Sequence, residues 1–196
     1  MRSNKPKDQQ FNKLKLVFML LFISPLIASC GMHYNIKGKV VDAQTGEPVE
    51  GAVVAIKWIR YKLAPPGLPT PKERYGTTER LTDTQGGFTI PKYTFGTHFM
   101  GIYKKGYVCW SSNTLFNQQG KTEDEMFVHR WVKIRNGMVV KLEPKDGTFP
   151  AVKHAIFVIQ DVGIKLSSPK PLFNEATEEE NRLDMENIRL RMKRKY

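Results

Sequence analysis

The sequence predicts a mainly β protein: a sandwich of about seven short antiparallel strands, followed by a helical C-terminal extension. Apolar and polar residues alternate in short runs, for example at 34–40 and 138–142, as in strands that bury one face. Gly, Asn, Asp and Pro residues separate these runs and favour turns. After residue 177 the pattern changes to an acidic start and a basic end, which is typical of a helix.

Length and charge narrow the class of protein. A chain of 196 residues suits one domain with appendages, and 40% apolar residues are enough for a core. The chain carries 31 Lys and Arg against 19 Asp and Glu, a net charge of +12 that favours anionic neighbours. Because the cations are spread along the whole chain, they do not predict a single nucleic-acid groove, and we expect no nucleic-acid partner.

The first 29 residues have the parts of a secretory signal peptide. A basic segment precedes the apolar run 16–23, and small residues follow that run. The run is shorter than the ~20 residues of a membrane-spanning helix. Its end, Ile27-Ala28-Ser29-Cys30, resembles the bacterial lipobox, in which the Cys thiol receives a diacylglyceryl group. The resemblance implies cleavage before Cys30 and anchoring by acyl chains such as palmitate.

This anchor sets the expected location and domain division. Gly31 follows the Cys, instead of the Asp that resembles an inner-membrane retention signal, which favours the outer membrane and its periplasmic side. The alternatives are an uncleaved membrane anchor, or a cleaved signal with an incidental Cys. We expect a signal peptide, a lipidated tether, the sandwich and the helical extension at residues 1–29, 30–34, 35–145 and 146–196 respectively.

The most specific pattern runs from residue 38 to 58. The alternation at 34–40 predicts one strand, and the apolar run 53–58 predicts a second. The connection at 42–48 combines a side-chain acceptor, a Gly and a Pro, as in a turn. We therefore expect the two strands to pair as an antiparallel hairpin.

These residues also carry a family resemblance. The motif consists of Gly38, Val40, Asp42, Thr45, Gly46, Pro48, Gly51, Ala52 and Val54, followed by Asp83, Gly86 and Phe88 and then by Gly106 and Tyr107. It resembles the carboxypeptidase regulatory-like domains over residues 34–143, apart from an enlarged loop after Trp58 and an insertion at 111–127. The resemblance implies a transthyretin-like Greek-key sandwich with an accessory role, and it supplies no catalytic residues.

Residues 60–76 hold four of the twelve prolines, which excludes a helix or a central strand there. We expect a long loop. Its aromatic, apolar and basic side chains suit a protein or glycan partner, although a passive insertion is an equal alternative. The candidate contacts are Tyr61, Leu68, Arg74 and Tyr75.

Strand signals resume at 77–82, 88–90, 99–103 and 107–111, whereas 112–126 is polar and predicts a loop. Next, Asn136-Gly137 between two alternating runs predicts a hairpin of 128–135 with 138–142. In such a turn both central residues take positive φ. Val140 and Leu142 should face inward opposite Val132 and Ile134.

The C-terminal region predicts helices. The apolar segment 151–162 fits a helix packed on the sandwich, with a strand as the alternative. Thr177 and Glu180 have the spacing of a capping box that starts a final helix. The basic end of that helix, 189–195, complements the helix dipole, and the alternative is an arm that contacts anionic lipid headgroups or cell-wall carboxylates.

The sequence contains no catalytic motif. Cys109 is the one Cys left after lipidation and reads as a buried small hydrophobe, and the four His residues have no metal-ligand spacing. We expect no enzyme, metal or cofactor, and a membrane-anchored module that binds an unidentified envelope protein or glycan. The alternatives are an envelope hydrolase or its accessory subunit, with polar groups convergent around His98 or His129, and a structural spacer.

Overall fold

The computed structural model describes residues 34–62, 65–68, 72–92, 97–147, 149–167 and 170–193, without the side chains of 34, 60, 61, 72–75 and 92. These residues belong to one compact unit that begins at Tyr34. The predicted signal peptide and the lipobox, Ile27 to Cys30, lie outside the described residues. No helix in these ranges has the length and hydrophobicity needed to cross a membrane.

Two sheets make up the sandwich. The first has the order β4-β1-β9, formed by Gly87–Lys92, Tyr34–Asp42 and Met138–Leu142. The second has the order β3-β2-β5-β6, formed by Lys72–Leu81, Val53–Tyr61, Thr97–Tyr103 and Trp110–Ser111. A separate pair joins β7 (Thr114–Phe116) to β8 (Phe127–His129).

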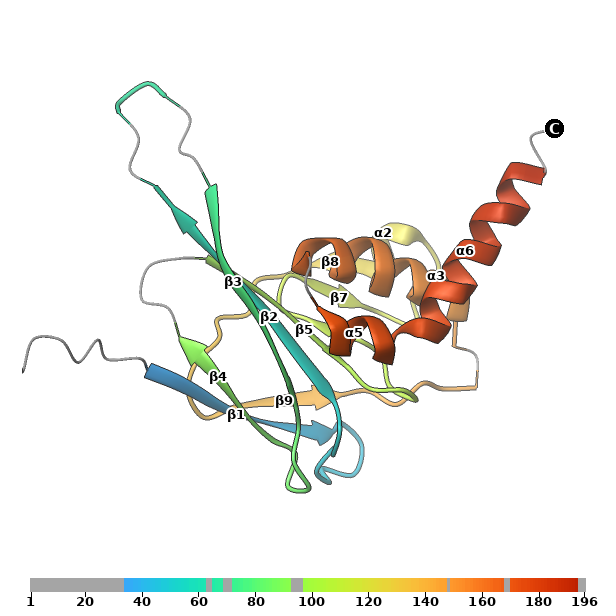
Figure 1. The fold of residues 1–196 in the computed structure, drawn as a ribbon. Coiled ribbons are helices and arrows are strands. Elements are labelled where there is room, and N and C mark those ends of the chain that lie inside the picture. Colours follow the sequence, from blue (N-terminus) through green and yellow to red (C-terminus); the bar gives the residue numbers. More distant parts are fainter. Residues whose placement is uncertain are drawn as a thin grey trace, which may run out of the picture. The chain divides into compact units, whose positions relative to one another are not determined.

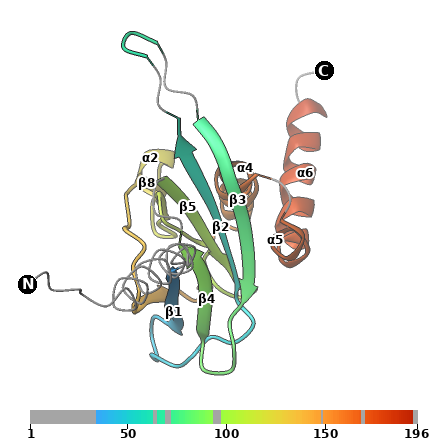
Figure 2. The same cartoon turned by 60° about the vertical axis from the view of Figure 1, so that its left-hand side comes forward.

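The helices follow the last strand, apart from α2 (Glu123–Met126). They are α3 (Ala151–Ile156), the π-helical segment η1 (Phe157–Gly163), α4 (Ile164–Leu166), α5 (Pro171–Ala176) and α6 (Glu178–Lys193). Figure 2 shows the resulting layers: β1 and β4 on one side, β2, β3 and β5 in the middle, and the helices beyond them.

The core between the two sheets confirms the mainly β sandwich. Its side chains come from alternate positions of both sheets, including Val40 of β1, Ile56 of β2, Ile90 of β4 and Val140 of β9. The prediction of a wholly antiparallel fold is wrong, because β9 pairs with β1 in parallel. The Greek-key, transthyretin-like order stays a prediction.

The predicted hairpin of the first two strands is also wrong. β1 pairs with β4 and β9, whereas β2 pairs with β3 and β5 in the other sheet. The connection between them contains a single bridge, Val41 with Pro48, and then crosses to the second sheet. Both strands alternate toward the same core, but they reach it from opposite sides, and the sequence pattern is the same for either arrangement.

Gly38 lets an aromatic ring lie across β1. It pairs with Phe88 of β4, and a Cβ at position 38 would lie 2.3 Å from the Phe88 ring. The ring is buried in the sandwich core. This Gly is therefore required by a close contact and not by a turn.

The other motif residues build turns at the strand ends. Asp42 Oδ1 accepts hydrogen bonds from the backbone N–H groups of Gln44 (2.7 Å) and Thr45 (2.9 Å), and these bonds lower the pKa of Asp42. Asp42 Oδ2 accepts the hydroxyl of Tyr107 at 3.0 Å, which ties this turn to the segment before β6. Asp83 Oδ1 accepts from Gln85 and Gly87. Positive φ angles occur at Gly46, Gly51, Gly86 and Gly106.

The predicted loop at 60–76 is shorter than expected. β2 continues to Tyr61 and β3 begins at Lys72, with Tyr61 paired to Lys72, so strands occupy both ends of the range. The paired ends of the two strands protrude beyond the rest of the sheet (Figure 1). The prolines lie outside these paired ends, which is why they do not prevent the pairing.

A second apolar core lies between the four-stranded sheet and the helices. Val53 and Ala55 of β2 and Phe99 of β5 pack there with Phe157 and Val162 of η1. The helix predicted over 151–162 is confirmed as α3 and η1, although Val152 near its start is exposed. The predicted loop at 112–126 is wrong in part, since it contains β7 and α2.

The predicted capping box does not form. The Thr177 hydroxyl donates to the carbonyl of Phe173 at 2.8 Å, so it closes α5 instead of capping α6. Glu180 turns inward and its Oε1 accepts from Lys145 at 3.0 Å. α6 buries Glu180 and Asp184, while Met185, Leu190 and Met192 are exposed. Tertiary contacts of polar groups thus replace the local cap.

Candidate binding groove

The groove arises where the sequence predicts the hairpin of 128–135 with 138–142. β9 is present, but residues 130–135 form no strand and do not pair with it. Of the two turn residues, Gly137 takes positive φ and Asn136 does not. The turn is held on β1 instead: Lys37 N–H donates to Asn136 Oδ1 at 2.9 Å, and Gly137 N–H donates to Lys37 O at 2.8 Å. The hairpin prediction is therefore wrong, because its two arms separate.

In the first arm of the predicted hairpin, residues 130–135 form their backbone hydrogen bonds with residues next to β6. The N–H groups of Arg130 and Val132 donate to the carbonyls of Asn113 (2.9 Å) and Ser112 (2.8 Å), next to β6. Arg130 Nε and Nη2 both donate to the Ser111 carbonyl, at 3.0 and 2.6 Å. These bonds attach the arm to the edge of the four-stranded sheet, while β9 stays on the three-stranded sheet.

A cavity of about 820 Å³ lies between the separated arms. This volume is within the usual range of ligand sites. The apolar part of its wall is formed by residues before and in the strands β6, β7 and β9. The lining residues used below are Val108, Cys109, Trp110, Phe116, Met138 and Val140. The groove therefore combines an apolar wall with one edge of a sheet.

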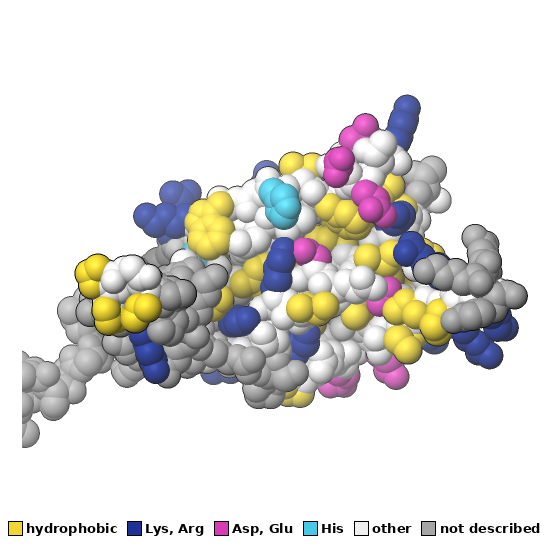
Figure 3. Space-filling model, turned by 90° about the horizontal axis from the view of Figure 1, so that it is seen from above, with side chains coloured by type: hydrophobic (Ala, Val, Ile, Leu, Met, Phe, Trp, Pro, Cys, Tyr) yellow, Lys and Arg dark blue, Asp and Glu magenta, His cyan; other side chains and the backbone are white. Residues whose placement is uncertain are grey.

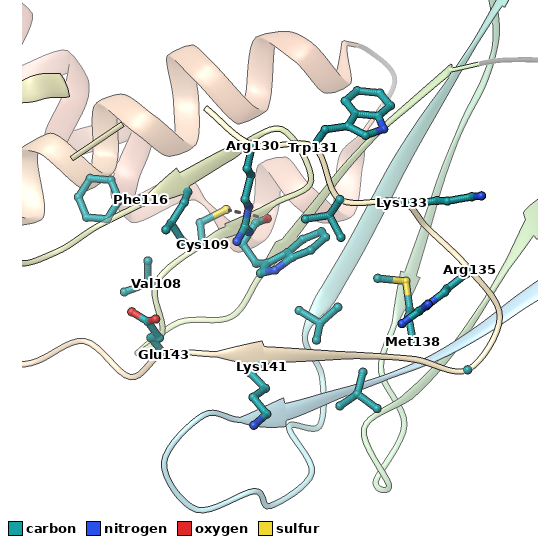
Figure 4. Close-up of a pocket in the computed structure, with 16 residues that line it drawn as sticks. Val108, Cys109, Phe116, Arg130, Trp131, Lys133, Arg135, Met138, Lys141 and Glu143 are labelled. Carbon is teal, nitrogen blue, oxygen red and sulfur yellow. Dashed lines mark hydrogen bonds between the residues drawn. The ribbon is translucent and has the colours of Figure 1, made fainter. Parts of the chain in front are cut away.

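Cations predominate among the charged groups that line this groove. Arg130, Lys133, Arg135 and Lys141 line it together with one acid, Glu143. Arg130 reaches from the arm toward β9, whereas Trp131 and Lys133 point away from the gap (Figure 4). Seen from above, cationic side chains are scattered between hydrophobic and acidic ones (Figure 3). The groove is thus a local region of positive charge beside apolar surface.

The groove aromatics are not equally accessible. The Arg130 guanidinium lies 5.0 Å from the centre of the Trp110 ring and covers it. Trp131 is 57% exposed and packs against His98, with 5.3 Å between ring centres. Only Trp131 of the two therefore offers a largely open ring.

The His residues expected around a catalytic cleft have other neighbours. His98 lies between the rings of Trp58 and Trp131, and its Nε2 is 3.3 Å from the carbonyl of Val132. Burial lowers its pKa. His129 is exposed on β8. In the described part of the chain, these contacts place rings and a backbone carbonyl around His98 instead of a set of convergent polar side chains.

The structure also gathers a buried polar cluster that the sequence did not predict: Tyr103, Cys109, Lys145, His154 and Glu180. His154 Nε2 accepts the backbone N–H of Cys109 at 2.9 Å, and its Nδ1 lies 3.8 Å from Glu180 Oε1. Burial and the nearby Lys145 lower the pKa of His154 to about 3. Burial, with Glu180 nearby, raises the pKa of both Tyr103 and Cys109.

This cluster holds the helices on the sheet. Because the backbone N–H of Cys109 occupies Nε2 of His154, that nitrogen is not available as a base for the thiol. Cys109 is buried and free of any disulfide, as the sequence predicts. The contacts of this cluster join residues that are 26 to 77 positions apart, from His154 with Glu180 to Tyr103 with Glu180, and no local spacing predicts that they meet.

The predicted partner contacts lie apart from the groove. Leu68 is described and is 62% exposed. Tyr61 belongs to β2, and Arg74 and Tyr75 to β3, but their side chains lie outside the described residues. β3 and β6 are at opposite edges of the four-stranded sheet. Among the described residues, no group of three or more His, Cys, Asp or Glu side chains is arranged to hold a metal ion.

Comparison with known proteins gives no family. No family model and no curated protein matches the chain. Among solved structures, the shaft pilin SpaA from Lactobacillus rhamnosus GG has a TM-score of 0.35 at 14% identity, over 59% of this chain and 49% of the pilin chain. The major pilin SpaD from Corynebacterium diphtheriae has 0.35 at 13% identity, over 58% and 30%.

The chain thus spans about half the length of the first pilin chain that it matches. Likenesses of this size do not assign it to the pilins. The resemblance of its motif to carboxypeptidase regulatory-like domains likewise stays a prediction.

Proposed function

We propose that this chain is a lipid-anchored protein of the bacterial cell envelope whose β-sandwich binds a partner and catalyses no reaction. The observation that carries the proposal is the cavity of about 820 Å³ between β9 and residues 130–135. It combines apolar walls, cationic side chains and an unpaired sheet edge, which are features of a recognition site.

The anchor rests on the N-terminal sequence. A basic segment, a short apolar run and Ile27-Ala28-Ser29-Cys30 occur in the order of a lipoprotein signal. Several acyl chains on Cys30 would hold the protein durably on a membrane, whereas one chain binds only marginally. Gly31 favours the outer membrane, with the sandwich in the periplasm.

Binding fits the groove better than catalysis does. Its charged lining residues are four cations and Glu143, and its one thiol, Cys109, is buried with a raised pKa. Acyl transfer by a Ser, Thr or Cys nucleophile needs that group within reach of a base, and Cys109 is the only residue of these three types in the described lining. The surroundings of His98, two Trp rings and the Val132 carbonyl, also give the hydrolase alternative no support.

Photo-cross-linking in the intact bacterium tests the proposal. A photoreactive amino acid is placed in turn at Lys133 on the groove rim, at Leu68 in the predicted contact loop, and at exposed Lys121 as a control. We expect a discrete cross-linked product from position 133 and none from position 121. A product only from position 68 would move the site to the loop, and no product from 133 or 68 would favour a structural spacer.

A further inference from the structure

The free side of β9 has the geometry to accept another strand. β9 is the last strand in its sheet, and the Leu142 carbonyl faces β1, where it accepts from Ala43 N–H at 2.8 Å. Backbone groups of successive residues in a strand point to alternate sides. The N–H and C=O groups of Val139 and Lys141 therefore point away from β1, toward the groove that both residues line.

The ends of the groove define its length. At one end the Asn136-Gly137 turn joins the arm to β9, and at the other the Glu143 carbonyl accepts from Val108 N–H at 2.8 Å. The five residues of β9 between these points correspond to about 17 Å of extended chain. A segment of about five residues therefore fits alongside β9.

The walls indicate which side chains this segment would carry. Met138 and Val140 are buried toward the sandwich, with Val108 and Phe116 also in the cavity wall. On the solvent side, Lys133, Arg135 and Lys141 are exposed. Since side chains of a strand alternate between its two faces, an inserted strand would meet apolar surface on one face and cations on the other.

We propose that the groove binds an extended acidic segment of a partner protein, with alternating apolar and acidic residues, as an additional strand beside β9. This inference rests on the proposed binding function and names its partner class. Backbone hydrogen bonds along a sheet edge supply affinity, and the pockets for alternate side chains supply specificity. An anionic glycan fits less well, because it lacks a repeating peptide backbone and Arg130 already covers the Trp110 ring.

The test uses the full chain in detergent and fluorescent nine-residue peptides. The first peptide alternates valine with glutamate, the second alternates valine with lysine, and the third is the first with N-methyl groups on alternate residues. We expect the first peptide to bind and to slow hydrogen exchange at the amides of Val139 and Lys141. The other two should bind at least tenfold more weakly.

Variants separate backbone pairing from charge. Val139→Pro removes an N–H that faces the groove, in a position where edge strands tolerate Pro, so we expect at least a tenfold loss of affinity. Val139→Ala keeps the N–H and should bind within about twofold of the parent, because the Val139 side chain is largely exposed. Lys133→Glu with Arg135→Glu should lose at least tenfold, while the matched pair Lys121→Glu with Arg189→Glu, away from the groove, should not.

Equal binding of the lysine peptide, of the N-methylated peptide or by Val139→Pro would overturn the inference. If Val139→Pro fails to fold, judged by circular dichroism, the N-methylated peptide still decides the point. If no peptide binds but position 133 cross-links to a protein or a glycan in cells, strand addition is wrong and the binding function stands. If neither position 133 nor position 68 yields a product, both proposals fail, and a product from position 68 alone refutes the groove as the binding site.

Discussion

At the scale of single residues, the structure separates side chains that shape the fold from those that set its response to pH. Gly38 contributes to the fold because it has no side chain: the Phe88 ring occupies the space where a Cβ would lie. His154 is held in its neutral form, because its Nε2 accepts the Cys109 N–H and its ring is fully buried. A charged ring would lose this hydrogen bond and would be buried near Lys145.

The burial of neutral His154 predicts that the free energy of unfolding decreases as the pH falls. The pKa of His154 is lowered from 6.5 to about 3, so below pH 6.5 the unfolded chain binds a proton that the folded chain excludes. The stabilisation is complete above pH 6.5 and decreases as the pH falls toward 3. The slope is about 1.4 kcal/mol per pH unit, or about 3 kcal/mol lost by pH 4.

Urea unfolding of the parent chain and of His154→Gln between pH 7 and pH 4 measures this loss. The Gln carbonyl can accept the same N–H without titrating, so its profile should lack this part of the slope. The control, His129→Gln, changes a ring exposed to solvent and should keep the parent's profile. Parallel profiles for His154→Gln and the parent would contradict the assignment.

At the scale of elements, α6 is held by polar contacts more than by an apolar face. Its exposed positions include Met185, Leu190 and Met192, while its buried ones include Glu180 and Asp184. Asp184 accepts two hydrogen bonds from Gln160 of η1, at 2.9 and 3.1 Å, and Glu180 accepts one from Lys145. These contacts position the helix. Removing Gln160 or Lys145 would leave the buried carboxylate of Asp184 or Glu180 without that hydrogen-bond donor.

Two neighbouring ion pairs of α6 allow a matched comparison. Lys145 and Glu180 are 3.0 Å apart with 23% and 3% of their side chains exposed, whereas Lys105 and Glu179 are 2.8 Å apart with 80% and 49% exposed. Lys145→Ala leaves the buried Glu180 unpaired and should lower the free energy of unfolding by about 3 kcal/mol. Lys105→Ala removes a solvated pair and should have little effect.

Chemical unfolding gives the two free energies, and hydrogen exchange locates the change. We expect the α6 amides to exchange faster in Lys145→Ala than in Lys105→Ala. Equal effects of the two substitutions would mean that the Lys145 pair does not position the helix.

At the scale of the whole molecule, the four-stranded sheet is covered on both faces. One face packs on the three-stranded sheet, and the other packs on η1, α4 and α5. The three-stranded sheet ends at β9, and the free edge of β9 lies beside the cavity, so this edge is a place where a partner strand can add to the fold.

The anchor is tested on the mature protein from the bacterium. Mass spectrometry should find Cys30 as the first residue, carrying acyl chains, because lipidation and cleavage both occur at that position. Cys30→Ala should remove the acyl mass and release the protein from the membrane fraction. A mature chain that keeps residues 1–29 without acyl chains would contradict the anchor.

The sequence by itself determined most of the strands, the turns at Asp42 and Asp83, and the burial pattern of the sandwich. Alternation at 36–40 and 138–142 places the apolar side chains in the core, and Asp42 and Asp83 form turns through contacts within four residues. These features depend on neighbours along the chain, so a local pattern contains the information. The cationic residues of the groove are evident in the sequence, but their position around one cavity is not.

Only the tertiary structure decided which strands pair and where the groove lies. The Asn136-Gly137 signal predicts a hairpin, yet Lys37 of β1, about a hundred residues away, binds the turn and Asn113 binds the arm. Likewise Glu180 contacts Lys145 and approaches His154 instead of capping its own helix. Local preferences of this kind are worth about 1 kcal/mol, and long-range burial and hydrogen bonding outweigh them.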